Sequence, residues 1–263
     1  PVWIRVPLTC PTAMPVTLSD LLDRFDLLLD TPNAIPQLRQ FILQLAVQGR
    51  LTEQNPEDEP AEALLKRIQE EKQRLYDEGE IRKPKTFERP ADNEVPFQVP
   101  ESWSWTFLGE IGDWGAGSTP KRSKPKYWND GTIPWLKIGD LNNGYVHEAE
   151  EKVTQQALDE CSLRMSQDGD VAIAMYGSIG KLGILPKQFV TNQAICACTP
   201  FGNISNLYLF FYLSAAKEMF VDLGAGGAQQ NISKTKIVNT PTPLPPLAEQ
   251  KRIVETVDRL MEE

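Results

Sequence analysis

The chain has 263 residues, 41% of them hydrophobic and 24% charged, which predicts a globular protein of one large domain or two small ones. No apolar run approaches the roughly 18 residues of a membrane-spanning helix, and the first residues lack the pattern of a secretory signal. The net charge of −9 excludes little, because phosphate binding requires only a local positive surface.

Residues 1–83 are expected to form an N-terminal helical region. Apolar side chains recur at helical spacing over 18–25, 36–49 and 60–79. The third of these helices has a charged face that we expect to be solvated, formed by Glu70, Glu71, Lys72 and Arg74. Residues 84–100 contain four prolines among charged side chains and predict an extended linker.

From residue 101 to residue 244, short apolar runs alternate with Gly, Pro and Asn, which is typical of strands joined by turns. The runs predict strands at Trp105–Leu108, Ile133–Ile138, Asp170–Tyr176, Gly183–Leu185 and Ala194–Thr199. One helix is expected at Ser205–Phe220. The predicted fold class is therefore α+β, with an irregular sheet and a few helices in this central block.

A last helix is expected within residues 245–263. Ile253, Val257 and Leu260 repeat at helical spacing and form a seam for another helix. A helix of this length is marginal alone, so it requires a partner. The candidates are the N-terminal helices of the same chain or of a second copy.

Several kinds of enzyme lack their motifs in this sequence. There is no GxxxxGK[ST] phosphate loop, no Asn/Asp-Pro-Pro-aromatic tetrapeptide and no glycine-rich cofactor loop in the required setting. Asp168 and Asp170 resemble a metal-binding pair, but a turn that enters the strand at 170–176 explains both. We expect no catalytic residue and no cofactor.

Cysteine and histidine usage also argues against a metal site. The four cysteines form no CxxC pair and His147 is the only histidine, so we expect no bound metal. Cys196 and Cys198 are two residues apart in an apolar run, which predicts buried thiols on one face of a strand. These features predict a reduced, cytoplasmic protein.

Positive charge is concentrated within residues 117–137 and opposed there only by Asp130; it comes from Lys121, Arg122, Lys124, Lys126 and Lys137. Gly117 and Pro120 predict a turn that presents the first four of these cations. Such a loop suits phosphates, with Tyr127 and Trp128 as a supporting aromatic wall. The alternative is a solvated loop, with Trp128 and Trp135 in the core.

The order and spacing of several segments resemble those of specificity subunits of Type I restriction-modification enzymes. In the central block the segments are Gly117–Pro120, Tyr127–Gly131, Ile133–Trp135, Asp168–Val171, Gly177–Lys181, Thr191–Ala194, Gln229–Ile232 and Pro243–Ile253. Upstream they are Leu38–Leu43, Ala46–Leu51 and Glu59–Lys72. The resemblance covers roughly residues 20–263.

This resemblance implies a non-catalytic protein that recognises double-stranded DNA. Residues 101–244 would form one target recognition domain, which reads one half of a split target, and residues 245–263 would begin a spacer helix. The implied partners are methyltransferase subunits and a restriction and translocation subunit. The chain is then a fragment, which we favour, or a half-subunit that dimerises. The alternatives are the recognition lobe of a fused methyltransferase or nuclease, and a protein-only adaptor.

On this interpretation, three further segments join the basic loop of Lys121, Arg122, Lys124, Lys126 and Tyr127. A glycine turn at a strand end carries Tyr176, Ser178 and Lys181. The amides of Asn192 and Gln193 can pair with adenine, although structural capping explains them nearly as well. A polar loop carries Gln229, Gln230, Asn231 and Lys234, and it either reaches base edges or closes the domain.

Overall fold

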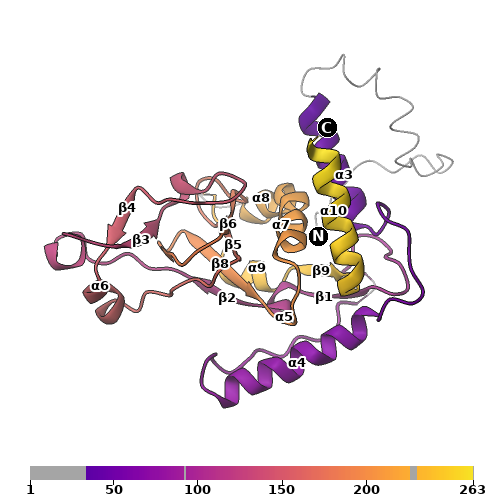
Figure 1. The fold of residues 1–263 in the computed structure, drawn as a ribbon, viewed down its shortest axis with the longest axis horizontal. Coiled ribbons are helices and arrows are strands. Elements are labelled where there is room, and N and C mark those ends of the chain that lie inside the picture. Colours follow the sequence, from indigo (N-terminus) through magenta and orange to yellow (C-terminus); the bar gives the residue numbers. More distant parts are fainter. Residues whose placement is uncertain (1–33, 92, 226–229, 263) are drawn as a thin grey trace.

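The computed structural model describes residues 34–91, 93–225 and 230–262 (Figure 1). The helix predicted at 18–25, Cys10 and Gln229 lie outside these residues. The strands and short helices form an elongated body, α3 and α10 stand side by side at one end of it, and α4 runs along one side (Figure 1).

Three of the predicted helices are confirmed, and their bounds are α3 (Ala34–Val47), α4 (Ala61–Asp77) and α10 (Leu247–Glu262). The predicted seam of α10 is buried, since Ile253 and Val257 are both fully covered. Helix α10 packs against α3, and Arg39 donates a hydrogen bond to the Met261 carbonyl at 3.4 Å. The partner of the C-terminal helix is thus an N-terminal helix of the same chain.

In the part of the chain that the structure describes, nine strands form three small sheets. A two-stranded antiparallel sheet pairs β1 (Ser104–Phe107) with β9 (Pro241–Leu244). A four-stranded antiparallel sheet has the order β2 (Gly112–Ala116), β8 (Ile195–Pro200), β5 (Asp170–Ala174), β6 (Leu182–Leu185). A three-stranded sheet has the order β4 (Glu151–Val153), β3 (Ile133–Leu136), β7 (Val190–Thr191). The α+β prediction and all five predicted strands are confirmed.

Short α-helices and 3₁₀ turns lie between the strands. They are α5 (Leu108–Ile111), η1 (Pro125–Tyr127), η2 (Ile138–Asp140), α6 (Gln155–Glu160), α7 (Asn206–Ala215), α8 (Lys217–Gly224) and α9 (Lys234–Val238). The prediction of a single helix at 205–220 is wrong in one respect, because this segment forms two helices. They meet at Ala216, whose backbone N–H bonds to the Ser214 and Tyr212 carbonyls and closes α7.

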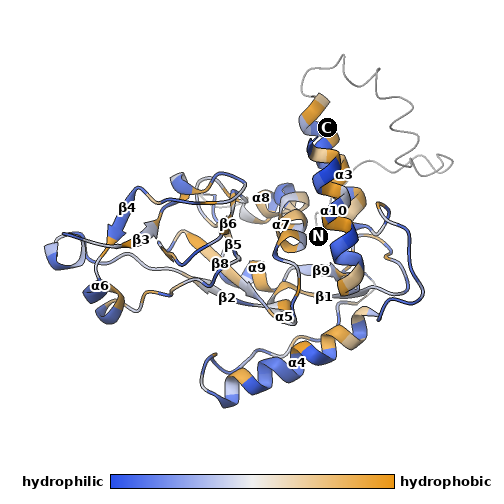
Figure 2. Ribbon diagram, viewed as in Figure 1, coloured by the Kyte–Doolittle hydropathy of each residue, from blue (hydrophilic) through white to orange (hydrophobic). Residues whose placement is uncertain are grey.

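The four-stranded sheet is covered on both faces, and every residue of β5 is buried. Val171, Ile173, Cys196 and Cys198 face the cluster that contains α7, while Ala172 and Ala174 face a second cluster with Phe189. Figure 2 shows the hydrophobic residues concentrated on β5 and α7 and hydrophilic residues over much of α4.

The thiols of Cys196 and Cys198 are core side chains. Burial raises the pKa of Cys196 to about 12, so its thiol is protonated at neutral pH. The prediction for the two cysteines is confirmed.

Helix α4 is attached to the body by a mixed contact. Ile68 lies beneath Gly202, where an added Cβ would come within 2.6 Å of the Ile68 side chain. Lys72 forms a buried ion pair with Glu110 at 2.9 Å. The assignment of Lys72 to the solvated face of the helix was therefore wrong, because helical periodicity does not reveal a carboxylate that a later segment supplies. Within the described ranges, no helix is both long and apolar enough to cross a membrane.

Candidate nucleic-acid interface

Four segments meet at one edge of the four-stranded sheet. The register pairs Ala116 with Cys196, Ala174 with Ile195 and Ile173 with Leu182, so β2 and β5 end where β6 and β8 begin. Tyr176 is bridged to Asn231, which brings the chain before α9 to the same place. We call this region the loop edge; it consists of residues 117–126, 175–181, 192–194 and 230–231. The topology thus gathers candidates from all four predicted segments.

The backbone of the basic loop is fastened to the sheet. The Ser118 N–H donates to the Thr191 carbonyl at 3.0 Å, and the Trp135 indole donates to the Ser118 carbonyl at 3.1 Å. The Trp128 indole donates to the Lys121 carbonyl at 3.2 Å. Trp135 is buried and Trp128 is half-buried, so both support the loop from beneath, as the core alternative predicted.

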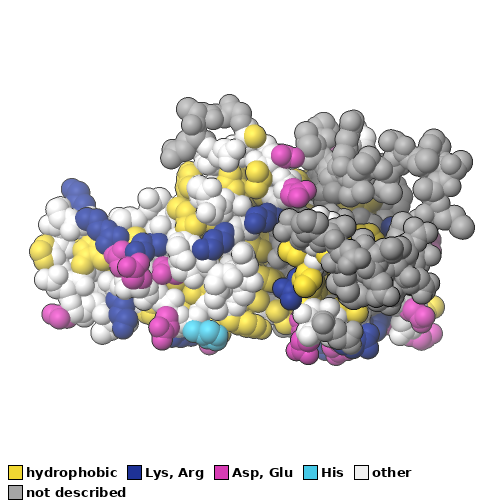
Figure 3. Space-filling view, turned by 90° about the horizontal axis from the view of Figure 1, so that it is seen from above, with side chains coloured by type: hydrophobic (Ala, Val, Ile, Leu, Met, Phe, Trp, Pro, Cys, Tyr) yellow, Lys and Arg dark blue, Asp and Glu magenta, His cyan; other side chains and the backbone are white. Residues whose placement is uncertain are grey.

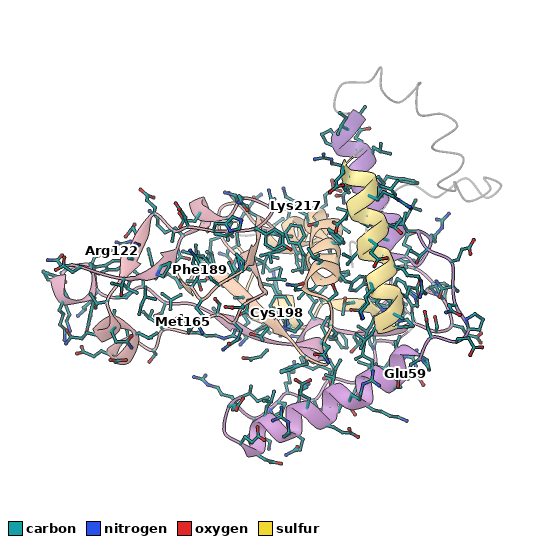
Figure 4. The ribbon with its side chains drawn as sticks, viewed as in Figure 1. Glu59, Arg122, Met165, Phe189, Cys198 and Lys217 are labelled. Atoms are coloured by element: carbon teal, nitrogen blue, oxygen red, sulfur yellow. The ribbon has the colours of Figure 1, made fainter. Side chains whose placement is uncertain are left out.

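All four cations of the loop are exposed, but two of them are held by carboxylates. Arg122 lies at the end of the elongated body, away from Lys217 (Figure 4). Its guanidinium stacks 3.8 Å from the Trp128 ring centroid and pairs with Glu151. Lys126 pairs with Glu160 at 2.6 Å. Hydrogen bonds from Lys126, and then from Tyr127, lower the pKa of Glu160 to about 2, so this carboxylate is ionised at neutral pH.

The other two cations of the loop, Lys121 and Lys124, remain available to bind phosphate. In the described part of the chain neither Lys121 nor Lys124 has a carboxylate partner, and the Lys124 ammonium lies 5.3 Å from the Tyr127 ring centroid. Figure 3 shows Lys and Arg side chains alternating with Asp and Glu at the end of the molecule far from α3 and α10. The local charge is therefore less positive than the loop sequence indicates, and Lys121 and Lys124 are its available cations.

Tyr127, predicted as a contact residue, is only 5% exposed. Its ring packs in the cluster of Trp135 and Val153, and its hydroxyl donates to Glu160 at 2.7 Å. The side chain therefore supports the loop from below and does not lie on its outer surface. This location agrees with the predicted aromatic wall and not with a direct contact.

The remaining candidates divide into side chains used within the fold and side chains at the surface. Lys181 donates to the carbonyls of Ile138 and Gly139, at 3.2 and 3.3 Å, which ties η2 to the loop edge. Asn192 caps its own turn by accepting from the Ala194 N–H at 3.0 Å. The exposed candidates are Tyr176, Ser178, Gln193, Gln230, Asn231 and Lys234. Structural capping, left open for the amide pair, thus applies to Asn192.

Sequence reasoning missed Thr119, whose hydroxyl donates to the Gln193 side-chain oxygen. This hydrogen bond joins the basic loop to the turn before β8 and orients the Gln193 amide. The only signal in the sequence was the position of Thr119 in the Gly117–Pro120 segment. The two groups are 74 residues apart, so no local pattern relates them.

Gly117→Ala is expected to lower the free energy of unfolding by about 1–3 kcal/mol, because an added methyl group overlaps the Thr191 backbone. Chemical denaturation measures this loss. Gly139→Ala is the matched control, since nothing lies within 4 Å of its Cβ position, and it should stay within about 0.5 kcal/mol of the parent. Equal stabilities for the two variants would contradict close packing of the loop on β7.

The acidic pair near β5 serves the fold. Asp170 opens β5, is 1% exposed and accepts from the Gln167 N–H at 3.1 Å, which closes the turn at Asp168. Burial raises the pKa of the Asp170 carboxyl. No cluster of His, Cys, Asp and Glu side chains that fits a metal ion occurs among the described residues. The turn explanation for Asp168 and Asp170 is confirmed.

Known proteins resemble this chain over most of its length. The family model described as Type I restriction modification DNA specificity domain matches residues 100–263. The specificity subunit of the Type I restriction enzyme EcoEI from Escherichia coli is 32% identical over 251 residues, which cover 89% of this chain and 41% of that protein. For the EcoAI specificity subunit, from the same species, the values are 29% over 252 residues, 91% and 42%. The chain thus spans less than half the length of these relatives.

Two solved structures share the fold. A chain from a study of the assembly and conformational transition of a type I restriction-modification system has a TM-score of 0.52 at 20% identity, and the match covers 92% of this chain and 50% of that one. The HsdS subunit from Thermoanaerobacter tengcongensis has a TM-score of 0.50 at 18% identity, with coverage of 92% and 49%. These matches support the α+β architecture.

Proposed function

We propose, from the premise that this chain belongs to the family of Type I restriction-modification DNA specificity subunits, that residues 101–244 are one target recognition domain. This domain binds double-stranded DNA and reads one half of a bipartite target without catalysing a reaction. The observation that carries the proposal is the loop edge, where cations and exposed amides from segments far apart in the chain lie together.

The side chains at the loop edge divide into two roles. Lys121 and Lys124 contact phosphates, which fix the position of the protein on the duplex but carry no sequence information. The exposed amides of Gln193, Gln230 and Asn231 are placed to read base edges, where Asn and Gln recognise adenine. Gln229 belongs to the same proposed set, and Tyr176, Ser178 and Lys234 complete the surface.

The helices would set the distance to the other half of the target. Helix α10 is fixed to the recognition domain and to α3, so its direction is determined by the fold. A second recognition domain, or a second copy of the chain, would lie along this direction, and the assembly would position methyltransferase subunits and a restriction and translocation subunit. We place this assembly in the cytoplasm.

The experiment is a titration of the intact complex with target and scrambled duplexes at several salt concentrations. The target is expected to bind about 10³-fold more tightly or better, and the logarithm of affinity should fall linearly with the logarithm of salt concentration. Lys66→Ala is the control, because Lys66 is exposed on α4, away from the loop edge. Binding without a salt slope and without target preference would refute the proposal.

A further inference from the structure

A groove runs between the segment that follows α4 and the edge strand β2. Its volume is about 740 Å³. One wall comes from residues 80–87, and the other comes from β2, the residues before β5 at 162–164, and α9. Strand β2 is the outermost strand of its sheet, so it pairs with β8 on one side only. The groove contains none of the residues of the loop edge, but it follows the strand that leads to them.

The groove is strongly basic in a chain whose net charge is −9. Two carboxylates, Glu80 and Asp113, line it. The basic side chains that line it are Lys72, Arg82, Lys83, Lys85, Arg164 and Lys234. A local surplus of this size favours an anionic occupant.

Three of these six cations already have partners, because Lys85 donates to the Asn239 side chain and two others pair with carboxylates. Lys72 pairs with Glu110, and Arg164 pairs with Asp113 at 2.9 Å. By contrast, Arg82, Lys83 and Lys234 are exposed and have no carboxylate partner in the described residues. Three cations thus remain available to a ligand.

The wall that carries Arg82 and Lys83 is held in place. The Lys85 ammonium donates to the Asn239 side chain at 2.8 Å, and it lies 4.8 Å from the Phe87 ring centroid. Phe87 in turn packs so closely on Gly109 that a Cβ there would overlap its ring. The cations therefore extend from an ordered segment, which lowers the entropy that is lost when they bind.

The groove is continuous with the loop edge. Ala116, the last residue of β2, lines the groove and directly precedes Gly117. Lys234 lies three residues beyond Asn231, which is bridged to Tyr176 at the loop edge. The five residues of β2 span about 16 Å, which corresponds to the axial rise of roughly five base pairs of DNA. A duplex bound at the loop edge can therefore reach the groove.

We propose that this groove binds the phosphate backbone of the DNA that flanks the half-target. Arg82, Lys83 and Lys234 make sequence-independent contacts there, which add affinity and not specificity. The inference rests on the proposed function of the loop edge. An acidic protein segment is the competing occupant, but the continuity of the groove with the loop edge favours DNA.

The test compares two target duplexes, one that ends at the half-target and one that extends beyond it, with the intact complex. Arg82→Glu combined with Lys83→Glu is expected to weaken binding of the long duplex about tenfold or more and to lower its salt slope by about 2. Binding of the short duplex should change less than twofold. Lys66→Glu combined with Arg67→Glu, an equal reversal of two exposed charges on α4, should leave the binding of both duplexes unchanged.

The outcomes separate the two proposals. Equal losses for both duplexes, or no loss for either, overturn the groove assignment and leave the loop edge intact. Weaker assembly with the partner subunits at an unchanged dependence on flank length also overturns it, in favour of an acidic protein segment. If the parent complex itself shows no target preference, the proposed function fails before the groove is tested.

Discussion

Replacement of Glu249 by leucine is expected to lower the free energy of unfolding by about 3 kcal/mol or more. Glu249 lies in the first turn of α10 and is fully buried. Its carboxylate accepts hydrogen bonds from Trp103 at 2.7 Å, Thr52 at 3.0 Å and Gln54 at 2.5 Å. Leucine would leave the buried Trp103 indole without an acceptor and would remove the acceptor of the half-buried Thr52 and the exposed Gln54.

The loss can be measured by chemical denaturation of the Glu249→Leu variant. Trp103→Phe is the matched control, because it removes one donor and keeps a ring in the core; it should cost about 1–2 kcal/mol. A loss below about 1 kcal/mol for Glu249→Leu would show that the three hydrogen bonds contribute little. Because the donors come from the segment after α3 and from the entry to β1, the cluster joins both α3 and α10 to the first strand of the β-sheet body.

Reversal of Lys121 and Lys124 to glutamate is expected to weaken binding of target DNA about 100-fold, which corresponds to roughly 2.8 kcal/mol. These two ammonium groups are the cations of the loop that no described carboxylate neutralises. Lys121→Ala with Lys124→Ala should lower the salt slope by about 2, since each phosphate contact contributes about 1. Titrations at several salt concentrations measure both effects.

Arg122→Lys is the informative comparison for this loop. Lysine keeps the charge but loses the planar stacking on Trp128. We therefore expect a several-fold loss of affinity at an unchanged salt slope, because the loop is less well ordered while the number of phosphate contacts stays the same. A salt slope that fell by about 1 would instead make Arg122 a phosphate contact.

The sequence predicted the parts of the fold that show helical periodicity of apolar residues or a continuous apolar run. Helices α3, α4 and α10 and the apolar strands β5 and β8 were all located correctly. Strands β4 and β7 were missed because they have only three and two residues. Strands β2 and β9 were missed because glycine and proline are depleted in most strands. Both lie at sheet edges, and the Pro241 and Pro243 carbonyls accept hydrogen bonds from the Tyr212 and Tyr208 hydroxyls. Contacts with other parts of the chain thus stabilise β9 although its residues have a low propensity for strands.

The sequence predicted the segments of the candidate site but not the charge balance that the fold gives them. The basic loop is visible as a local run, whereas Glu151 and Glu160 reach it from 29 and 34 residues further along the chain. Only the pairing of β3 with β4 and the packing of α6 on η1 bring these carboxylates beside Arg122 and Lys126. A net charge counted along the sequence cannot include them.

The position of the loop edge has a consequence for how target preference can change. The exposed amides of Gln193 and Gln230 lie outside all three hydrophobic clusters, so their replacement leaves the packing of the sheet untouched. A new side chain at position 193 removes only the hydrogen bond from Thr119, so the cost in folding is small. Under the proposed function, the same scaffold can therefore carry different base-reading side chains while the sheet beneath them stays constant.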